Sequence, residues 1–264
     1  MTLLKHVDFE VPAFGELPAG VSVKPGYPAL VAALGPVACW RLGDSTGSVV
    51  VDAAGGTNGA YVGGVTLGQP GALALNPDIA ARFDGVTGHV DLGNTFESLF
   101  AGVSPFSISA HFKLDSQASS IYPMILARSA DWQGVQVFIN APNVAQPGRV
   151  VFRRARGSTA GNFVDAYTDA AVTVGQWHHV ACVFDGGWQR VYLDGGAGAA
   201  AVGGAVIVGG VSYTSPSRRL QLAARDAGNA LRFLFPGSLD EVALFNRALS
   251  EAEVRALYLT GAGR

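Results

Sequence analysis

Short β-strand patterns recur from residue 37 onward, and glycine-rich turns separate them. The clearest one alternates apolar and polar side chains, with the apolar set at Phe106, Ile108, Ala110 and Phe112. Because successive side chains of a strand point to opposite faces, one face here belongs to a core and the other faces solvent or a ligand. Many short strands at close spacing indicate a two-sheet sandwich or a barrel.

Tight turns and a single helix complete this pattern. The Asp-Gly-Gly triplets at 185–187 and 194–196 supply residues that tolerate positive φ, which predicts a hairpin at each. A helix is predicted after Ser250, which can cap the first turn together with Glu253, three residues on. Gly261 is a stop signal for that helix.

Residues 1–36 differ from the rest of the chain and are predicted to form an extended N-terminal docking arm. Prolines stand at 12, 18, 25, 28 and 36, and the apolar content is high for a solvated linker. Such an arm lies against another surface, either its own sandwich or a partner chain. Residues 37–264 then form one β domain.

Composition excludes several classes of partner and site. A net charge of −2 and a pI near 6.2 give no broad attraction to nucleic acid or anionic membranes. The first residues carry His6, Asp8 and Glu10 where a secretory signal needs an apolar run, so no signal peptide is expected. No apolar stretch reaches the ~20 residues of a membrane span. Cys39 and Cys182 have apolar neighbours, which favours reduced core residues over a disulfide.

The ordered segments resemble the laminin-G-like, concanavalin A-like jelly-roll family in its bacterial and phage form. The most specific segment, GQWHHVACVFDGGWQRVYLDG, spans residues 175–195, and the others are ACWRLGDSTGSVVVDAAGGTNGAY, AARFDGVTGHVDLG, PFSISAHFKLDS and FPGSLDEVALFNRALSEAEVRALY. The resemblance covers about residues 37–260. It implies an all-β, two-sheet antiparallel jelly-roll sandwich with one short C-terminal helix, carried behind the N-terminal arm.

An enzyme is not expected. Glycosidases need two carboxyl groups facing one cleft, about 5 to 10 Å apart. The sequence lacks the Glu-x-Asp-x-x-Glu strand of laminarinase-like relatives, and the adjacent Asp240 and Glu241 are predicted to point to opposite faces of a strand. His178 and His179 also point oppositely, so they cannot chelate one metal together and are interpreted as structural. An aspartate-only glycosidase stays as an alternative.

Calcium is the ion that the resemblance implies. Many relatives carry a Ca²⁺ site that ties the first strand region to the last, and the matching acidic positions are Asp44 and Asp240. Hard cations need six to eight oxygen ligands, which loop carbonyls around an aspartate pair can supply. The alternative interpretation is that Asp44 caps a turn and Asp240 pairs with an arginine.

Ligand binding would depend on aromatic and basic residues. Trp132 and Trp188 lie in turn-like settings where an indole can stack on a sugar ring or fold back onto its own sheet. Trp40 and Trp177, on apolar strands, are predicted to be core. A basic cluster can face an anionic glycan or a neighbouring subunit, or can be a solvated strand; its members are Arg149, Arg153, Arg154 and Arg156.

The first hypothesis is a non-catalytic virion protein, of the decoration or tail-fibre type. It is made in the host cytoplasm, docks onto other virion proteins through residues 1–36 and presents the sandwich outward, toward host glycans; a homo-oligomer or larger assembly is expected. The second hypothesis is a free carbohydrate-binding lectin, and the third is a glycoside hydrolase of the same fold.

Overall fold

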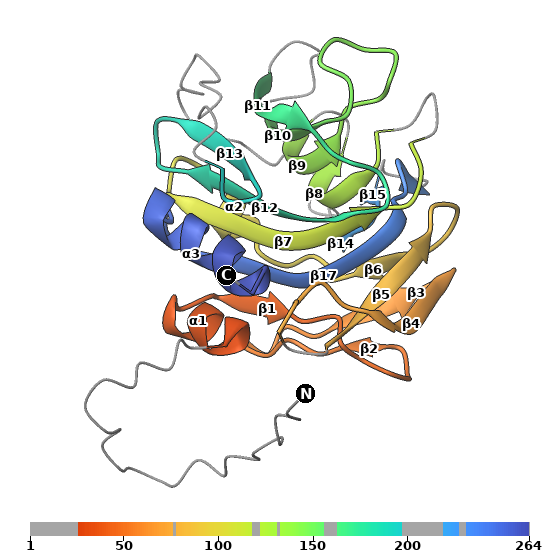
Figure 1. Cartoon of the computed structure of the whole chain (residues 1–264). Helices are drawn as coiled ribbons and strands as arrows, with labels where there is room; N and C mark the ends of the chain where they lie inside the picture. Colours follow the sequence, from red (N-terminus) through yellow and green to blue (C-terminus); the bar gives the residue numbers. More distant parts are fainter. Residues whose placement is uncertain are drawn as a thin grey trace, which may run out of the picture.

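The chain folds into two antiparallel β-sheets packed face to face, as a computed structural model shows (Figure 1). The structure describes residues 26–75, 78–117, 122–130, 133–155, 163–196, 219–226 and 231–263. Both sheets are antiparallel throughout their described pairs, and one large apolar core lies between them. The predicted all-β jelly-roll sandwich is confirmed.

The first sheet has seven strands, in the order β13-β12-β7-β17-β5-β4, with β1 also paired to β17. The strands are β1 (Ala38–Trp40), β4 (Val65–Pro70), β5 (Ile79–Asp84), β7 (Phe106–Leu114), β12 (Trp177–Phe184), β13 (Gln189–Leu193) and β17 (Pro236–Phe245). The predicted Asp-Gly-Gly hairpin at 185–187 joins β12 to β13. The second triplet follows β13, and the residues after 196 lie outside the described part of the chain.

The second sheet has eight strands, in the order β11-β10-β9-β8-β14-β6-β3-β2. The strands are β2 (Val49–Val50), β3 (Gly59–Val62), β6 (His89–Asp91), β8 (Met124–Ala130), β9 (Gln133–Ile139), β10 (Arg149–Ala155), β11 (Phe163–Ala171) and β14 (Leu220–Leu222). A two-stranded ribbon of β15 (Arg225–Asp226) and β16 (Leu231–Arg232) lies beside β8.

The two faces of β7 are both buried, for different reasons. Phe106, Ile108, Ala110 and Phe112 belong to the core between the sheets, as their alternation predicts. The opposite face, predicted to meet solvent or a ligand, is instead covered: Ser107 and Ser109 are fully buried. Two helices, α1 (Tyr27–Ala33) and α3 (Glu251–Gly261), pack over this outer face of the seven-stranded sheet (Figure 1).

The prediction of an extended arm over residues 1–36 is wrong for its C-terminal part, where residues Tyr27–Ala33 form helix α1. Pro28 stands in the first turn, where its missing N–H costs no hydrogen bond, and its fixed φ favours a helix start. Tyr27 and Val31 are buried in a second apolar cluster on the seven-stranded sheet, which α3 shares through Val254 and Leu257. Residues 1–25 lie outside the described part of the chain, so the remainder of the predicted arm stays a prediction.

Helix α3 begins where its sequence predicts, whereas Gly261 is its last helical residue and the glycine with positive φ beyond it is Gly263. The Ser250 side chain accepts from the Glu253 backbone N–H, and the Glu253 carboxylate accepts from the Ser250 backbone N–H. A short helix, α2 (Glu97–Phe100), follows β6. Cys39 and Cys182 are buried free thiols. Among the described residues, no helix has the length and apolar character needed to cross a bilayer.

Candidate functional site

A groove lies on the outer face of the eight-stranded sheet, away from the main core. In β9, Val135, Val137 and Ile139 enter the core, so Gln136 and Phe138 point to the opposite face. The same alternation in β10 turns Arg153 outward. The groove has a volume of about 370 Å³, within the usual range of small-ligand sites.

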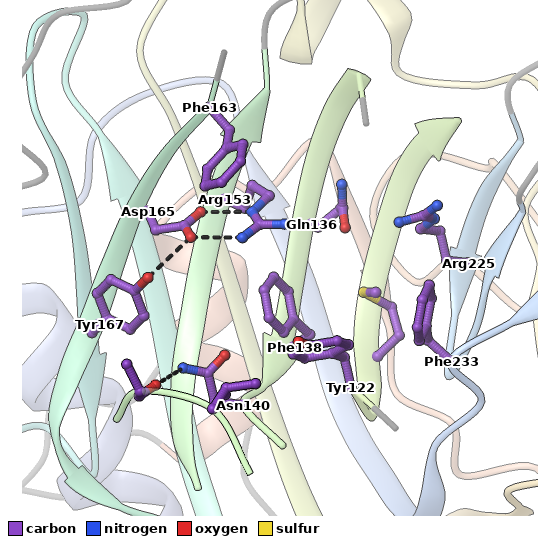
Figure 2. A pocket seen from close by; sticks show the side chains of 13 residues that line it. Tyr122, Gln136, Phe138, Asn140, Arg153, Phe163, Asp165, Tyr167, Arg225 and Phe233 are labelled. Carbon is purple, nitrogen blue, oxygen red and sulfur yellow. Dashed lines mark hydrogen bonds and ion pairs between the residues drawn. The ribbon is translucent and has the colours of Figure 1, made fainter. Parts of the chain in front are cut away.

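The groove is lined by side chains of β8, β9, β10, β11 and β15, by the loop after β9, and by Tyr122 and Phe233, which lie just before β8 and just after β16 (Figure 2). Its aromatic members are Tyr122, Phe138, Phe163, Tyr167 and Phe233. Its polar members are Gln136, Asn140, Arg153, Asp165 and Arg225, and Met124, Val144 and Ala145 complete the lining.

A bidentate ion pair fixes one end of the groove. Arg153 donates from Nε and Nη2 to the two carboxylate oxygens of Asp165, at 2.7 Å each. The Arg153 guanidinium also lies 4.0 Å from the ring centre of Phe163 and 5.1 Å from that of Phe138. Tyr167 donates its hydroxyl to Asp165, and burial, followed by the Asp165 charge, raises the pKa of Tyr167 to about 12. The pair is therefore held rigidly by its neighbours.

The aromatic rings form a connected surface beside these polar groups. Tyr122 packs edge-to-face on Phe138 and on Phe233, with ring centres 5.6 and 5.7 Å apart. Figure 2 shows Tyr167, Phe138, Tyr122 and Phe233 crossing the sheet, with Asp165, Arg153, Gln136 and Arg225 on one side of these rings and Asn140 on the other. The arrangement offers ring faces and edges next to hydrogen-bonding groups.

The basic cluster divides between the two faces of β10. Arg153 lines the groove, whereas Arg154 is only 1% exposed and points into the sandwich, where it donates to the Gly102 carbonyl and lies 3.6 Å from the centre of the Phe184 ring. The prediction that Arg154 contacts a ligand is wrong, because β10 pairs regularly at this point and its neighbours Arg153 and Arg154 therefore face opposite sides. Arg149 donates to the Thr168 carbonyl, and Arg156 lies outside the described residues.

The predicted tryptophans do not meet in the groove. Trp188 is 44% exposed in the turn between β12 and β13, on the other sheet, and is not among the lining residues. Trp132 lies outside the described part of the chain. Trp40 is fully buried, as predicted, but Trp177 is only half-buried and carries the Lys113 ammonium over its ring, so its assignment to the core is wrong.

Sequence reasoning missed most of the groove, although one signal was present. In the segments VQVFIN and RVVFRRA, alternate residues are Val, Ile or Phe and belong to the core. The residues between them, which point to the outer face, include an amide, an aromatic ring and a guanidinium. An outer face that carries Phe138 beside Gln136 is unusual for a plain solvated strand. That Tyr122 and Phe233 join the same surface follows only from the fold.

A second polar centre, the acidic cluster, consists of Asp78, Asp240 and Glu241. One oxygen from each lies within 4.8 Å of the others. Arg41 contacts two members: its Nε donates to Glu241 at 2.8 Å and its Nη2 to Asp78. Asp240 and Glu241 are almost fully buried, and each keeps one carboxylate oxygen with no hydrogen-bond partner among the described residues.

A β-bulge brings Asp240 and Glu241 together, which corrects the prediction that they point to opposite faces. Leu239 and Val242 both enter the core, so two residues stand between successive core positions of β17. The pairing with β7 shifts between Asp240 and Ala243, and Glu241 has a φ of 50°. The interval of three between core residues in LDEV is the sequence signal for this bulge.

The donors of the acidic cluster fit a hard cation. Burial is the main cause that raises the pKa of Asp240 to about 8 and of Glu241 to about 7, so ionising both without a cation is costly. Carboxylate oxygens are the ligands that Ca²⁺ prefers. Asp44 is not one of the three residues of this cluster and accepts from the Tyr61 hydroxyl, so the prediction that Asp44 and Asp240 hold one ion stays a prediction.

The two neighbouring histidines point to opposite sides, as predicted. His178 bonds to Asp194 at 2.7 Å, whereas His179 contacts Ser109 at 2.9 Å on the face below the helices. Burial lowers the pKa of His179 to about 4 and that of His111 well below its usual value. Both rings are therefore neutral at pH 7, and no group of three metal-ligating side chains in the described structure includes them.

Comparison with known proteins gives the family of the chain and solved structures with a similar fold. The family described as "Concanavalin A-like lectin/glucanases superfamily" matches residues 84–255. Domain 4 of an extracellular arabinanase from Geobacillus stearothermophilus, solved with arabinotriose, is similar at a TM-score of 0.60 and 16% identity, over 84% of this chain and 98% of that one. No curated protein sequence matches the chain.

Two larger solved proteins are similar over part of their length. The binding domain of Paraclostridial Mosquitocidal Protein 1 has a TM-score of 0.62 at 16% identity, and 85% of this chain covers 52% of that one. Trypanosoma rangeli sialidase, solved with sialic acid, has a TM-score of 0.59 at 17% identity, and 93% of this chain covers 35% of it. The chain thus spans about half the length of the mosquitocidal protein's binding domain and about a third of the sialidase. Sequence identities this low show a similar fold and nothing more.

Proposed function

The chain belongs to the concanavalin A-like lectin/glucanase superfamily, and from that premise we propose that it is a lectin-like module that binds a glycan in the groove of the eight-stranded sheet. The observation that carries the proposal is the pairing of an aromatic surface with fixed polar groups in one groove. Tyr122 and Phe138 provide the surface, and Arg153 and Asp165 provide the polar end.

Sugars need both kinds of contact. A pyranose ring has C–H groups that pack on an aromatic ring, and hydroxyls around its rim that need hydrogen-bond partners once water is removed. The Arg153 and Asp165 pair holds donors and acceptors in one geometry before a ligand arrives. This preorganisation reduces the entropy cost of binding.

Binding without catalysis is the proposal for this groove. Among its described lining residues, Asp165 is the single carboxylate, and both of its oxygens accept from Arg153. Hydrolysis of a glycosidic bond needs two carboxyl groups facing one site. Sugar release from a polysaccharide panel, abolished by Asp165→Asn, would instead favour the hydrolase alternative.

The experiment is glycan-array binding by the full chain and two groove variants, Tyr122→Ala and Tyr167→Ala. We expect each variant to lose about tenfold or more in affinity, since aromatic contacts contribute beyond their buried area. Trp188→Ala is the matched control, because Trp188 is an exposed aromatic residue on the other sheet. Loss of binding in Trp188→Ala, with both groove variants unaffected, would move the site to the turn between β12 and β13.

We also propose that the acidic cluster holds a structural Ca²⁺. The support is the pair of buried, unpartnered oxygens on Asp240 and Glu241, together with the strained bulge that brings them together. The ion would supply positive charge between β17 and the residue that precedes β5, Asp78. Arg41 already neutralises part of the cluster, so the ion's role is to stabilise the remaining charge.

The place of this lectin-like module in a virion is a further proposal. It is supported by the apolar residues of the first 25 positions, among them Phe9 and Phe14, which a free lectin does not need. The proposed role is docking onto other virion proteins. The test is incorporation into particles after deletion of residues 1–25, which spares helix α1; unchanged incorporation would reject docking through this segment.

A further inference from the structure

A second cavity lies on the outer face of the seven-stranded sheet, whereas the groove lies on the other sheet. It has a volume of about 270 Å³ and lies between β7, the start of β12 and the C-terminal end of helix α3. Gln176, one of its lining residues, is exposed, so the cavity opens to solvent. None of the three residues of the acidic cluster lines it, so neither of the sites proposed above uses this cavity.

Two histidines stand side by side in this cavity. His111 of β7 and His179 of β12 both line it and are direct cross-strand partners, with ring centres 4.9 Å apart. Residues directly opposite each other in an antiparallel pair project to the same face. Both side chains are nearly fully buried, with 4% and 1% of their surface exposed. The sheet therefore presents two imidazole rings together at the inner wall of the cavity.

Each of these rings has a nitrogen without a partner. Nδ1 of His111 and Nδ1 of His179 are buried and have no hydrogen-bond partner among the described residues. The other nitrogen of His179, Nε2, contacts the Ser109 hydroxyl at 2.9 Å. When Nε2 donates its proton to Ser109, Nδ1 of the same ring carries a lone pair. Buried polar atoms normally have a partner, so two such nitrogens beside one cavity point to a ligand.

The two helices over this face hold the rings in place. Tyr27 of α1 packs edge-to-face on His111 at 5.1 Å, and Tyr258 of α3 stacks on His179 at 6.5 Å. The end of α3 also meets the His111 ring: a Cβ at Gly261 would lie 2.7 Å from Nε2 of His111, so the helix comes this close only with glycine. Side chains whose orientation is fixed by packing form a more precise site than mobile ones.

Two neutral imidazoles suit a divalent transition metal. Burial lowers the pKa of both rings, so each is neutral at pH 7 and keeps a lone pair on one nitrogen. Imidazole nitrogen is a ligand of Zn²⁺, Ni²⁺ and Cu²⁺, whereas Ca²⁺ prefers oxygens of the kind that the acidic cluster supplies. A metal-bound histidine commonly donates its other N–H to a partner, and the Ser109 hydroxyl stands in that place for His179.

We propose that His111 and His179 bind one divalent transition-metal ion between β7 and β12, with water molecules of the cavity as its remaining ligands. This inference depends on neither the proposed glycan site nor the proposed calcium site. A cavity of this size has room for an ion and its waters. The ion links two neighbouring strands beneath α3 and stabilises the folded state as its concentration rises.

The test is metal binding by the full chain, with excess Ca²⁺ present to fill sites built from oxygens. Calorimetry measures the binding of Zn²⁺, and electron paramagnetic resonance reads the ligands of bound Cu²⁺. We expect one ion per chain and a Cu²⁺ spectrum with splitting from two imidazole nitrogens. His111→Gln and His179→Gln should each weaken Zn²⁺ binding about tenfold or more, because loss of an outer partner of a metal ligand already costs that much.

Two control variants should keep the binding of Zn²⁺. His89→Gln is matched in burial, because His89 is 5% exposed, but it lies in β6 on the other sheet. Asp240→Asn changes the acidic cluster and leaves both cavity histidines in place. Thermal unfolding without metal checks that each variant is folded. The Cu²⁺ spectrum of the unmodified chain tests the nitrogen ligands without any variant.

Four results would overturn the inference. If the unmodified chain bound neither Zn²⁺ nor Cu²⁺, the site would be rejected while the proposed glycan binding stayed in place. A Cu²⁺ spectrum without nitrogen splitting would assign the ion to oxygen ligands. Unchanged Zn²⁺ binding in either His111→Gln or His179→Gln would show that the two rings do not share an ion. Binding that depended on His89 or Asp240, and not on the cavity histidines, would place the ion at another centre.

Discussion

Arg153 and Asp165 face each other across β10 and β11, and their side chains close a planar fork of two hydrogen bonds at the edge of the groove. Both side chains are largely buried, with exposures of 14% and 6%. An ion pair in this position differs from one on an open surface, because removing one partner leaves a charge with little water around it.

Asp165→Asn should therefore weaken both ligand binding and the fold. We expect the free energy of unfolding to fall by about 1 to 3 kcal/mol, since the Arg153 guanidinium loses its charged acceptor. Denaturant unfolding measures this change, and glycan-array binding measures the groove. Asp185→Asn is the control, because its pair with Arg190 is more exposed, and it should cost less than about 1 kcal/mol. If Asp165→Asn and Asp185→Asn lowered the free energy of unfolding equally, the burial of the Arg153 and Asp165 pair would add nothing to its contribution.

Calcium should raise the melting temperature of the chain. At about a hundred times its dissociation constant, a ligand of the folded state stabilises it by about 2.7 kcal/mol. Asp240→Asn should remove most of this increase, because Asp240 supplies a buried oxygen with no other partner. The measurement is thermal unfolding with calcium and with a chelator.

Asp44→Asn is the matched control for calcium. Asp44 accepts from Tyr61 and lies outside the acidic cluster, so this variant should keep the full calcium response. If Asp44→Asn lost the response while Asp240→Asn kept it, the ion would bind at the first strand region instead. If neither the unmodified chain nor its variants responded, the cluster would be a buried ion-pair network with Arg41.

The fold was predictable because its signals are local and repeated. The alternation at Phe106 to Phe112 fixes the core face of β7, and Ser250 with Glu253 predicts the start of α3. These features depend on neighbours within a few residues. The cover on the other face of β7 was not predictable in this way, because α1 and α3 come from opposite ends of the chain.

The candidate sites depend on contacts between distant segments. Arg153 was predicted to reach a ligand, but its partner Asp165 lies on the next strand, and Tyr122 comes from the segment just before β8. Asp240 was predicted as a cation ligand, whereas Asp78 meets it only through the fold. A strand rule that assumes regular alternation also fails at Glu241, where the bulge turns the side chain.

Tyr27 should be a stabilising residue of the domain, although it lies within the predicted arm. It is 3% exposed and packs edge-to-face on His111 at 5.1 Å. We expect Tyr27→Ala to lower the free energy of unfolding by about 3 kcal/mol, the scale of a buried aromatic truncation. Ala32→Ser, on the exposed side of α1, should change it by less than about 0.5 kcal/mol. If both variants unfolded like the unmodified chain, α1 would not contribute to the stability of the sandwich.

Glu253 should make the stability of the chain depend on acid pH. Its hydrogen bonds to Arg247, and then those to Ser250, lower the pKa of this carboxyl from 4.5 to about 2. The folded state therefore favours the ionised form, so the stabilisation is present above pH 4.5 and is lost as the pH falls toward 2. Glu253→Gln removes the titrating group but keeps an acceptor for the Ser250 N–H.

The stability difference between the unmodified chain and Glu253→Gln should consequently shrink between pH 5 and pH 2, which denaturant unfolding at several pH values measures. Ser250→Ala provides the comparison: it removes the other half of the capping box and should cost about 1 kcal/mol. That cost includes the lost bond to the Glu253 backbone N–H, which does not titrate, so part of it must persist at low pH. A difference for Glu253→Gln that stayed constant across this range would show that packing, not charge, fixes the start of α3.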